Sequence, residues 1–497
     1  MKNNTTNSYK HTLKYAGLFG GVQGLNLMIG LIRNKLVALI LGPAGMGLVS
    51  LYNSTITLMS NTTNFGLSMS GVKRISEYYD EYNDSTTLSE NVRLIRSLCI
   101  VAAILGILLC SVLSGQLSLW TFGNYEETMG FIMLSPMVGM LAVIAGELAI
   151  MKGVRMLRPL AVISIFNVVA AVIISVPIFY IYGRNGIIPS FLLLTLSQLI
   201  FTLRYSYRRF PLRLSFSVKF LSRGWNIIKL GFAFVVAGVF GSGADFLIRL
   251  FLNNCGSLDT VGLYNSGFVM TMVYGGLVFS AMETDYFPRL SAVAHGNIIE
   301  QNNVVNNQVE VSLLLVSPML TAFITFLPII LPLLFSHKFV AVLPMVQVTV
   351  LALYMRAMKL PLAYIALSKS DSKCFLLLEL TYAVVFLILV CGFFKLFGLT
   401  GTGYGILITA IFDFIVLMIF THFRYRYVIS KTVLFISIIQ LPLGIASYIA
   451  SQLLHGWPYW LIGAFISFLS LSYSIYIFHS KTHLLSSIKN KFGKIKS

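Results

Sequence analysis

Charged side chains inside long apolar stretches are the residues of this sequence with the most informative chemistry. Arg33, Arg356 and Lys359 fall near the middle of such stretches, and Arg249 lies nearer the end of another. A basic side chain at the centre of a bilayer costs about 2.5–3.5 kcal/mol on insertion scales, so it usually faces a water-filled cavity. Guanidinium and ammonium groups in such a cavity bind phosphates. We therefore predict a cationic, anion-binding cavity.

Two acidic residues, Asp245 and Asp413, also lie inside apolar stretches. Asp245 precedes Arg249 by four residues, so the two side chains share one face of a helix and can form an ion pair. The sequence does not decide whether this pair is structural or functional.

The spacing of the basic residues indicates which of them share a face. Arg356 and Lys359 are three residues apart, with no acid beside them in sequence, so they repel each other unless they meet an anion. Arg33 and Lys35 are two residues apart and point in different directions, and we expect Arg33 to be the one that enters the cavity.

Span 46–70 is too polar to face lipid, because it is rich in Ser, Thr and Asn, including Asn53 and Asn61. Unpaired polar groups are costly in hydrocarbon, so this span should line water or pack between helices. We favour the water-lined interpretation and place Asn53 and Asn61 among the residues of the substrate cavity.

Patterns of enzyme active sites are missing from the sequence. No GxxxxGK[ST], HExxH or GxSxG motif occurs, and the glycines at Gly401, Gly403 and Gly405 open an apolar stretch, where they favour close helix packing. The five cysteines form no CxxC pattern or Cys/His metal spacing. We therefore expect a protein that is not an enzyme and that has no metal or cofactor.

The elements that must position these residues are transmembrane helices. Hydrophobic residues make up 57% of the 497 positions and charged residues only 11%, whereas soluble domains have about 45–50% and about 25%. This composition predicts an all-α polytopic membrane protein. With about 20 apolar residues per crossing, about fourteen spans are expected, at 15–40, 46–70, 96–114, 129–150, 158–180, 186–203, 226–251, 260–286, 310–334, 340–366, 374–394, 402–421, 432–453 and 459–478.

Basic residues in the loops between these spans are distributed unevenly. Twenty-seven Lys and Arg residues fall in loops on one side and three, Arg184, Lys338 and Lys395, on the other. Because cytoplasmic loops are enriched in Lys and Arg, we expect both termini to be cytoplasmic. This topology also explains the net charge of +19 without a nucleic-acid partner. The cytoplasmic loops 71–95, 204–225 and 287–309 are the longest, and the segment 289–310 is expected to lie along the membrane interface.

An internal repeat indicates two similar halves. Leu51-Tyr52-Asn53-Ser54 recurs as Leu263-Tyr264-Asn265-Ser266, and Tyr182-Gly183-Arg184-Asn185-Gly186 aligns with Phe397-Gly398-Leu399-Thr400-Gly401. An offset of six spans preserves orientation, so the repeat is parallel, a common transporter plan with the substrate site between the halves. We predict a six-helix lobe at 1–210, a second at 211–430, and a helix pair with a basic tail at 431–497.

The opening of the chain resembles a known family. Leu41-Gly42-Pro43-Ala44-Gly45-Met46-Gly47 joins the first two spans, and the polar second span ends in Gly71-Val72-Lys73-Arg74-Ile75. This pattern is similar to bacterial polysaccharide flippases of the Wzx type, in the multidrug/oligosaccharidyl-lipid/polysaccharide exporter superfamily. Gly398-Leu399-Thr400-Gly401-Thr402-Gly403 resembles the glycine turn before their twelfth span.

The resemblance implies two six-helix lobes around a central cavity. It also implies an oligosaccharide linked to a polyprenyl diphosphate of the undecaprenyl type, an O-antigen or capsule repeat unit, moved from the cytoplasmic to the outer leaflet by alternating access. Such a protein would lie in the bacterial inner membrane and work with a glycan polymerase in lipopolysaccharide or polysaccharide assembly. No ATP site is evident, so Asp245 and Asp413 are candidates for ion coupling.

Two other functions stay open at this point. A drug or cation exporter of the same superfamily would share the fold, although an acidic cavity would suit its substrates better. A membrane glycan polymerase or transferase would need paired carboxylates or a diphosphate-metal site on a sizeable loop.

Overall fold

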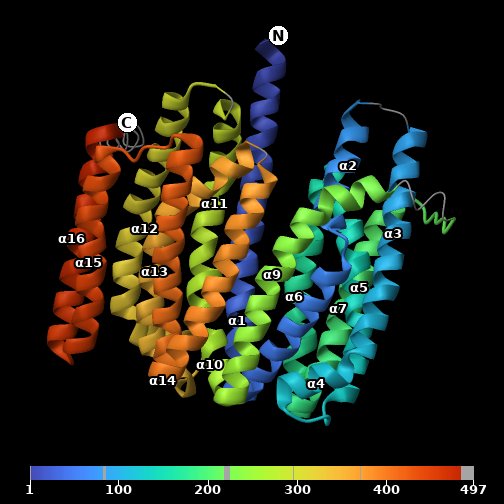
Figure 1. Ribbon diagram of the computed structural model, residues 1–497, viewed down its shortest axis with the longest axis horizontal. Helices are drawn as coiled ribbons and strands as arrows, with labels where there is room; N and C mark the ends of the chain where they lie inside the picture. Colours follow the sequence, from blue (N-terminus) through green and yellow to red (C-terminus); the bar gives the residue numbers. More distant parts are fainter. Residues whose placement is uncertain (1, 82–84, 218–223, 295, 370, 483–497) are drawn as a thin grey trace, which may run out of the picture. The chain divides into compact units, whose positions relative to one another are not determined.

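The computed structural model describes residues 2–81, 85–217, 224–294, 296–369 and 371–482 (Figure 1). Every regular element among them is helical, which confirms the all-α prediction. Ten helical stretches of the described chain are long and apolar enough to cross a membrane. Part of the predicted loop 204–225, at 218–223, and the end of the predicted basic tail, at 483–497, lie outside the described residues.

Three of the ten stretches are long enough for two crossings each. Gly21–Thr63 has 43 residues, and Leu157–Arg209 and Lys373–Tyr425 have 53 each. A helix rises 1.5 Å per residue, so about 20 residues span the hydrocarbon core. The chain is therefore a multi-pass membrane protein, and the figure of about fourteen spans stays a prediction.

The helices form two compact units. Unit 1 comprises Met1–Asn265, Leu334–Lys338 and Glu379–Leu387, and unit 2 comprises Ser266–Leu333, Phe339–Leu378 and Ile388–Ser497. The predicted lobe boundaries at 210 and 430 rest on the repeat and stay a prediction.

Unit 1 is built from the helices of the first half of the chain. They are α1 (Lys2–Thr63), α2 (Leu67–Glu81), α3 (Ser85–Val112), α4 (Ser114–Phe122), α5 (Thr128–Gly153), α6 (Leu157–Tyr182), η1 (Gly183–Gly186), α7 (Ile187–Arg209), α9 (Trp225–Cys255) and most of α10 (Leu258–Phe268). Helix α5 packs against both α3 and α7, and α9 packs against α1, α2 and α4. Ile75, Ile95 and Ile150 form part of the buried core where α2, α3 and α5 meet.

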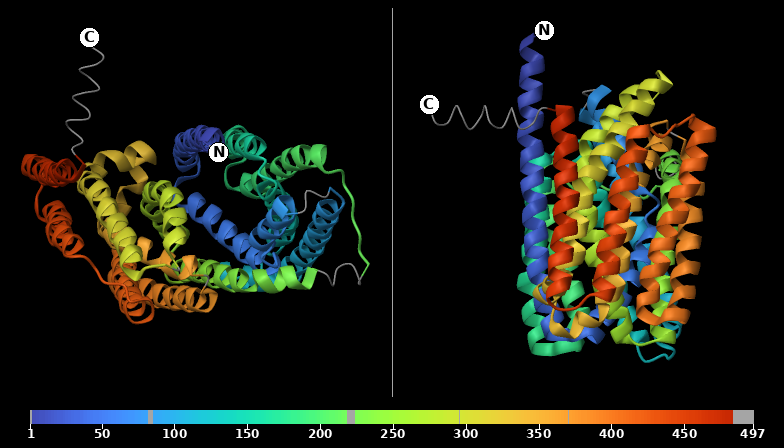
Figure 2. Two further views of the ribbon diagram at one scale, coloured as in Figure 1. Left: turned by 90° about the horizontal axis from the view of Figure 1, so that it is seen from above. Right: turned by 90° about the vertical axis from the view of Figure 1, so that its left-hand side faces the viewer.

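Unit 2 contains the remaining helices. They are η3 (Val269–Tyr274), which is a π-helical turn, α11 (Gly275–Val293), α12 (Ile298–Leu334), η4 (His337–Val342), α13 (Leu343–Ser368), α14 (Ser372–Tyr425), α15 (Lys431–Leu453) and α16 (Trp457–Thr482). The last two helices lie side by side at one edge of this unit, and α15 also contacts α13 (Figure 2).

Glycine breaks divide the helical stretches, at Gly42 where the sequence predicts a junction between spans and at Gly66 within a predicted span. In α1 the only non-helical residue is Gly42, with a φ of 66°, directly before Pro43. The predicted span 46–70 is interrupted at Phe65 and Gly66, which both have positive φ. A Cβ atom at Gly66 would lie 2.6 Å from the backbone oxygen of Gly231, so this break also allows α9 to approach.

The predicted long loops are largely helical. Most of 71–95 belongs to α2 and α3, which leave only 82–84 between them outside the described residues. Residues 298–309, expected in a segment along the membrane interface, form the beginning of α12. The polar sequence of these regions had indicated loops, but polar helices can extend beyond the apolar core of a span.

The aligned glycine turns of the sequence repeat have the same local geometry. Gly183 and Gly398 have φ values of 55° and 60°. Three residues later, a Cβ atom at Gly186 would lie 2.9 Å from the oxygen of Ile178, and one at Gly401 would lie 2.0 Å from that of Phe393. The contacted carbonyl is eight residues before the glycine in both copies. This part of the sequence repeat is therefore also a repeat of the local structure.

Gly401→Ala and Gly186→Ala should each destabilise the protein, because a Cβ atom forces the backbone across the turn to move. Such overpacking costs about 1–3 kcal/mol. Gly392→Ala is the matched control, since no atom lies within 4 Å of a Cβ at that position in α14. Thermal unfolding in detergent measures the effect, and equal melting temperatures for Gly401→Ala and Gly392→Ala would contradict it.

Candidate functional site

Arg356 lies on α13 and is half-buried in unit 2. Its Nη1 donates a hydrogen bond to the carbonyl of Met272, 3.1 Å away in the π-helical turn. The guanidinium carbon lies 5.5 Å from the centre of the Phe279 ring, within cation–π range. Gly276 leaves room for this approach, because a Cβ there would be 3.3 Å from the guanidinium nitrogens. No carboxylate of the described residues forms an ion pair with Arg356.

Lys359, one turn further along α13, forms an ion pair with Asp413 of α14. The Asp413 side chain is buried, whereas that of Lys359 is partly exposed. The sequence showed no acid beside Lys359, and the structure supplies one from another helix. Of the two basic residues on this face, therefore, one is neutralised within unit 2.

Arg249 and Asp245 form the ion pair that their spacing predicts. The guanidinium of Arg249 is buried and also donates to the Ser50 hydroxyl at 2.6 Å and to the Asn265 side chain at 3.2 Å. The aromatic ring of Tyr264 lies 5.9 Å away. Tyr264 and Asn265 belong to the repeated tetrapeptide, so its second copy helps to hold Arg249.

The remaining candidates lie on α1. The Nε of Arg33 donates to the Ser175 hydroxyl of α6 at 3.0 Å. The Asn61 side chain approaches the carbonyl of Gly238 in α9 at 3.4 Å, and Asn53 is exposed. The candidates Arg33, Asn53, Asn61, Asp245 and Arg249 thus belong to unit 1, while Arg356, Lys359 and Asp413 belong to unit 2.

Many hydroxyl groups of the polar span bond to their own helix. Thr55, Thr57, Thr62 and Thr63 each donate to the carbonyl four residues earlier. Such bonds satisfy a hydroxyl without water. They explain how a helix this rich in Thr is accommodated in an apolar setting.

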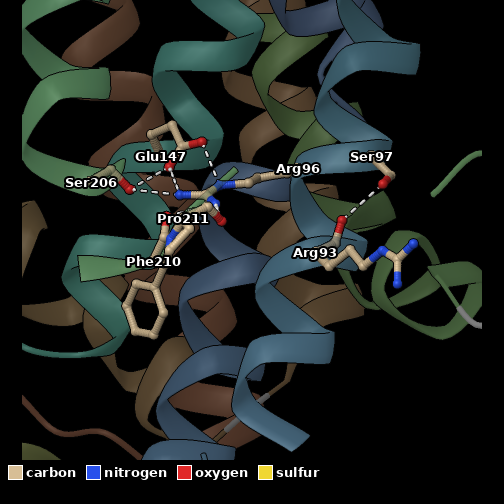
Figure 3. A network of polar contacts seen from close by, with 7 residues as sticks. All are labelled: Arg93, Arg96, Ser97, Glu147, Ser206, Phe210 and Pro211. Atoms are coloured by element: carbon tan, nitrogen blue, oxygen red, sulfur yellow. Dashed lines mark hydrogen bonds and ion pairs between the residues drawn. The ribbon is translucent and has the colours of Figure 1, made fainter. Parts of the chain in front are cut away.

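A buried network in unit 1 was not predicted from the sequence. Arg96 of α3 donates to both carboxylate oxygens of Glu147 of α5, at 2.8 and 3.1 Å (Figure 3). The Ser206 hydroxyl of α7 donates to the same carboxylate, and Arg96 also donates to the carbonyls of Phe210 and Pro211 at 3.0 Å. Lys152 is the base nearest to Glu147 in sequence. The partner of Glu147 lies 51 residues earlier.

The family of the chain follows from its sequence. The family model described as "Polysaccharide biosynthesis protein" matches residues 13–294, more than half of the chain. A comparison with curated proteins found no match.

Solved structures that superpose on this chain include transporters and a flippase. The lipid II flippase MurJ in an inward closed conformation superposes with a TM-score of 0.73 at 16% identity, covering 93% of this chain and 99% of MurJ. An inward-facing multidrug resistance transporter of the MATE family gives 0.66 at 15% identity, covering 81% and 94%. A transporter of the MOP superfamily from Pyrococcus furiosus gives 0.58 at 13% identity, covering 83% and 96%. The chain therefore belongs to the polysaccharide biosynthesis protein family and has the fold of MOP-superfamily transporters.

Proposed function

We propose that this protein is a flippase that moves polyprenyl-diphosphate-linked oligosaccharide, an O-antigen or capsule repeat unit, from the cytoplasmic to the outer leaflet. Alternating access would expose one cavity to each side in turn. The substrate would be of the undecaprenyl-diphosphate type, and a glycan polymerase would act on the product. Membership of the polysaccharide biosynthesis family and the likeness of the fold to MurJ support this proposal.

The observation that carries the proposal is the chemistry of Arg356. Arg356 belongs to an apolar helix, and its guanidinium makes one hydrogen bond to a carbonyl of the described chain. A guanidinium has five N–H groups arranged to grip a phosphate. We propose that Arg33 also supplies positive charge for a diphosphate, and that Lys359, Arg249, Asn53 and Asn61 contact the substrate as well.

The acidic candidates fit ion coupling better than cation export. Asp245 and Asp413 each pair with a basic residue, whereas an exporter of cationic drugs would need carboxylates that its substrate can reach. We propose that protonation or cation binding at Asp245 or Asp413 loosens these pairs during transport.

The transport proposal predicts the outcome of deleting the gene. Lipid-linked oligosaccharide should accumulate in the cytoplasmic leaflet, while its synthesis continues. Extraction of the lipid-linked pool and measurement of surface glycan in the same cells separate export from synthesis. If the purified protein extended or transferred glycan instead, the flippase proposal would be wrong.

Both termini are proposed to lie in the cytoplasm of a bacterium, with the protein in its inner membrane. Reporters fused after Arg213 and after Lys481 should therefore read cytoplasmic, and one near Trp120 should read external. The reason is the positive-inside distribution of the basic residues. An external signal after Lys481 would contradict the fourteen-span topology.

A further inference from the structure

A cavity of about 550 Å³ in unit 1 is lined by four arginines, Arg93, Arg96, Arg209 and Arg213. No acidic residue is among the described residues that line it. This size lies within the usual range for ligand pockets, about 300–1,000 Å³. We propose that this cavity is a binding site for a phosphate ester, with Arg209 and Arg213 as its ligands.

Arg96 lines the cavity but adds no net positive charge to it. Its guanidinium is neutralised by Glu147, and its remaining bonds hold the carbonyls of Phe210 and Pro211 (Figure 3). The ring of Tyr207 lies 4.6 Å from the guanidinium carbon. The buried ion pair therefore fixes the chain just after α7, the segment that contains Arg213 and directly follows Arg209.

A second set of bonds fixes the same segment to α3. Arg93 donates from Nε and Nη2 to the carbonyl of Leu214, at 3.0 and 2.8 Å. The backbone N–H of Ser215 donates to the Ser97 hydroxyl at 3.0 Å. Residues 210–215 are thus held in place without being helical. Arg213 lies within this segment, and Arg209 directly precedes it.

Arg209 and Arg213 supply the available positive charge. Both are exposed, and neither forms an ion pair with a carboxylate in the described ranges of the chain. Guanidinium groups bind phosphate oxygens through paired, charge-assisted hydrogen bonds. Two arginines that line one cavity repel each other, and an anion bound between them would reduce that repulsion.

Most of the other lining residues are apolar, which indicates the source of the phosphate group. Leu88, Val92, Val154, Met156 and Phe210 face the same cavity. The cavity lies where three candidate membrane spans begin or end, at Thr86, Gly153 and Arg209. Basic pockets between helices at the membrane surface bind anionic lipid head groups. An anionic phospholipid fits this combination of charge and apolar surface, and a soluble phosphate ester shares its chemistry.

The test compares two double variants of the full-length protein that lose the same charge. Arg209→Gln/Arg213→Gln removes the proposed ligands, and Arg204→Gln/Arg208→Gln is the matched control, because both control residues are exposed near the end of α7 but do not line the cavity. Binding of phosphatidylglycerol and of phosphatidylcholine to protein in detergent is measured by native mass spectrometry. Thermal stability is measured with and without glycerol 3-phosphate.

The wild type and the control variant should bind phosphatidylglycerol in preference to phosphatidylcholine. The cavity variant should bind it about tenfold more weakly or worse, since hydrogen bonds to charged groups are lost. Stabilisation by glycerol 3-phosphate alone, lost in the cavity variant, would support the site with a soluble ligand instead. Equal binding by the two double variants, or no response to either phosphate ester, would overturn the proposal. None of these readouts depends on transport activity.

Discussion

Replacing both Arg33 and Arg356 by alanine is expected to abolish glycan export while the protein still accumulates in the membrane. Each arginine is proposed to grip the diphosphate, and hydrogen bonds to charged groups are worth about 1.5–3 kcal/mol. Each single replacement should therefore slow transport roughly tenfold to hundredfold. In the structure Arg356 contacts a carbonyl and an aromatic ring, and no described carboxylate would be left unpaired by its loss.

Conservative and neighbouring variants sharpen this expectation. Arg356→Lys should retain partial transport, because the charge survives and only the paired N–H geometry is lost. Lys35→Ala, two residues after Arg33 on the same helix, is the matched control and should export normally. Surface glycan and membrane abundance are measured in the same cells. Normal export by the Arg33→Ala/Arg356→Ala variant would exclude a cationic-cavity mechanism that depends on these residues.

Lys359 should behave differently from Arg356, although the two share a helix. Its partner Asp413 is buried, so Lys359→Ala leaves a buried carboxylate without its ion pair. We expect less folded protein for this variant, and recovery when Asp413→Asn is added. The contrast separates a basic residue that also pairs with a buried acid from one with no such partner among the described carboxylates.

Local features of the fold could be predicted from the sequence. Apolar length and glycine positions mark the helices and their breaks, as at Gly42 and at the paired turns of Gly183 and Gly398. Helix ends were harder to predict. The polar residues around 71–95 indicated a loop, whereas α2 and α3 continue through most of it.

Partners between helices could not be predicted, because they depend on the rotation and register of each helix. The ion pair of Asp245 and Arg249 could be predicted, since both residues lie on one helix. Arg96 with Glu147, and Lys359 with Asp413, join residues far apart in the chain. One sequence signal did exist for the arginine-lined cavity: Arg93 and Arg96 are three residues apart, so they share a face of α3.

Breaking the Arg96–Glu147 pair should destabilise unit 1 more than any other replacement of a charged residue discussed here. The two side chains are only 3% and 2% exposed. Removing one partner of a buried ion pair leaves an uncompensated charge and costs about 3–5 kcal/mol. Glu147→Leu and Arg96→Leu should each lower the free energy of unfolding by that amount, measured by denaturation in detergent.

The double variant Arg96→Leu/Glu147→Leu tests whether an uncompensated buried charge causes the loss of stability. Apolar replacement of both partners removes the isolated charge, so stability should recover beyond either single variant. Recovery should be incomplete, because the carbonyls of Phe210 and Pro211 lose their donor. The control is the Lys73–Glu77 pair of α2, whose side chains are 60% and 45% exposed. Glu77→Leu should change stability by less than about 1 kcal/mol. If Glu147→Leu changed stability no more than Glu77→Leu does, the buried Arg96–Glu147 pair would not be a main source of the stability of unit 1.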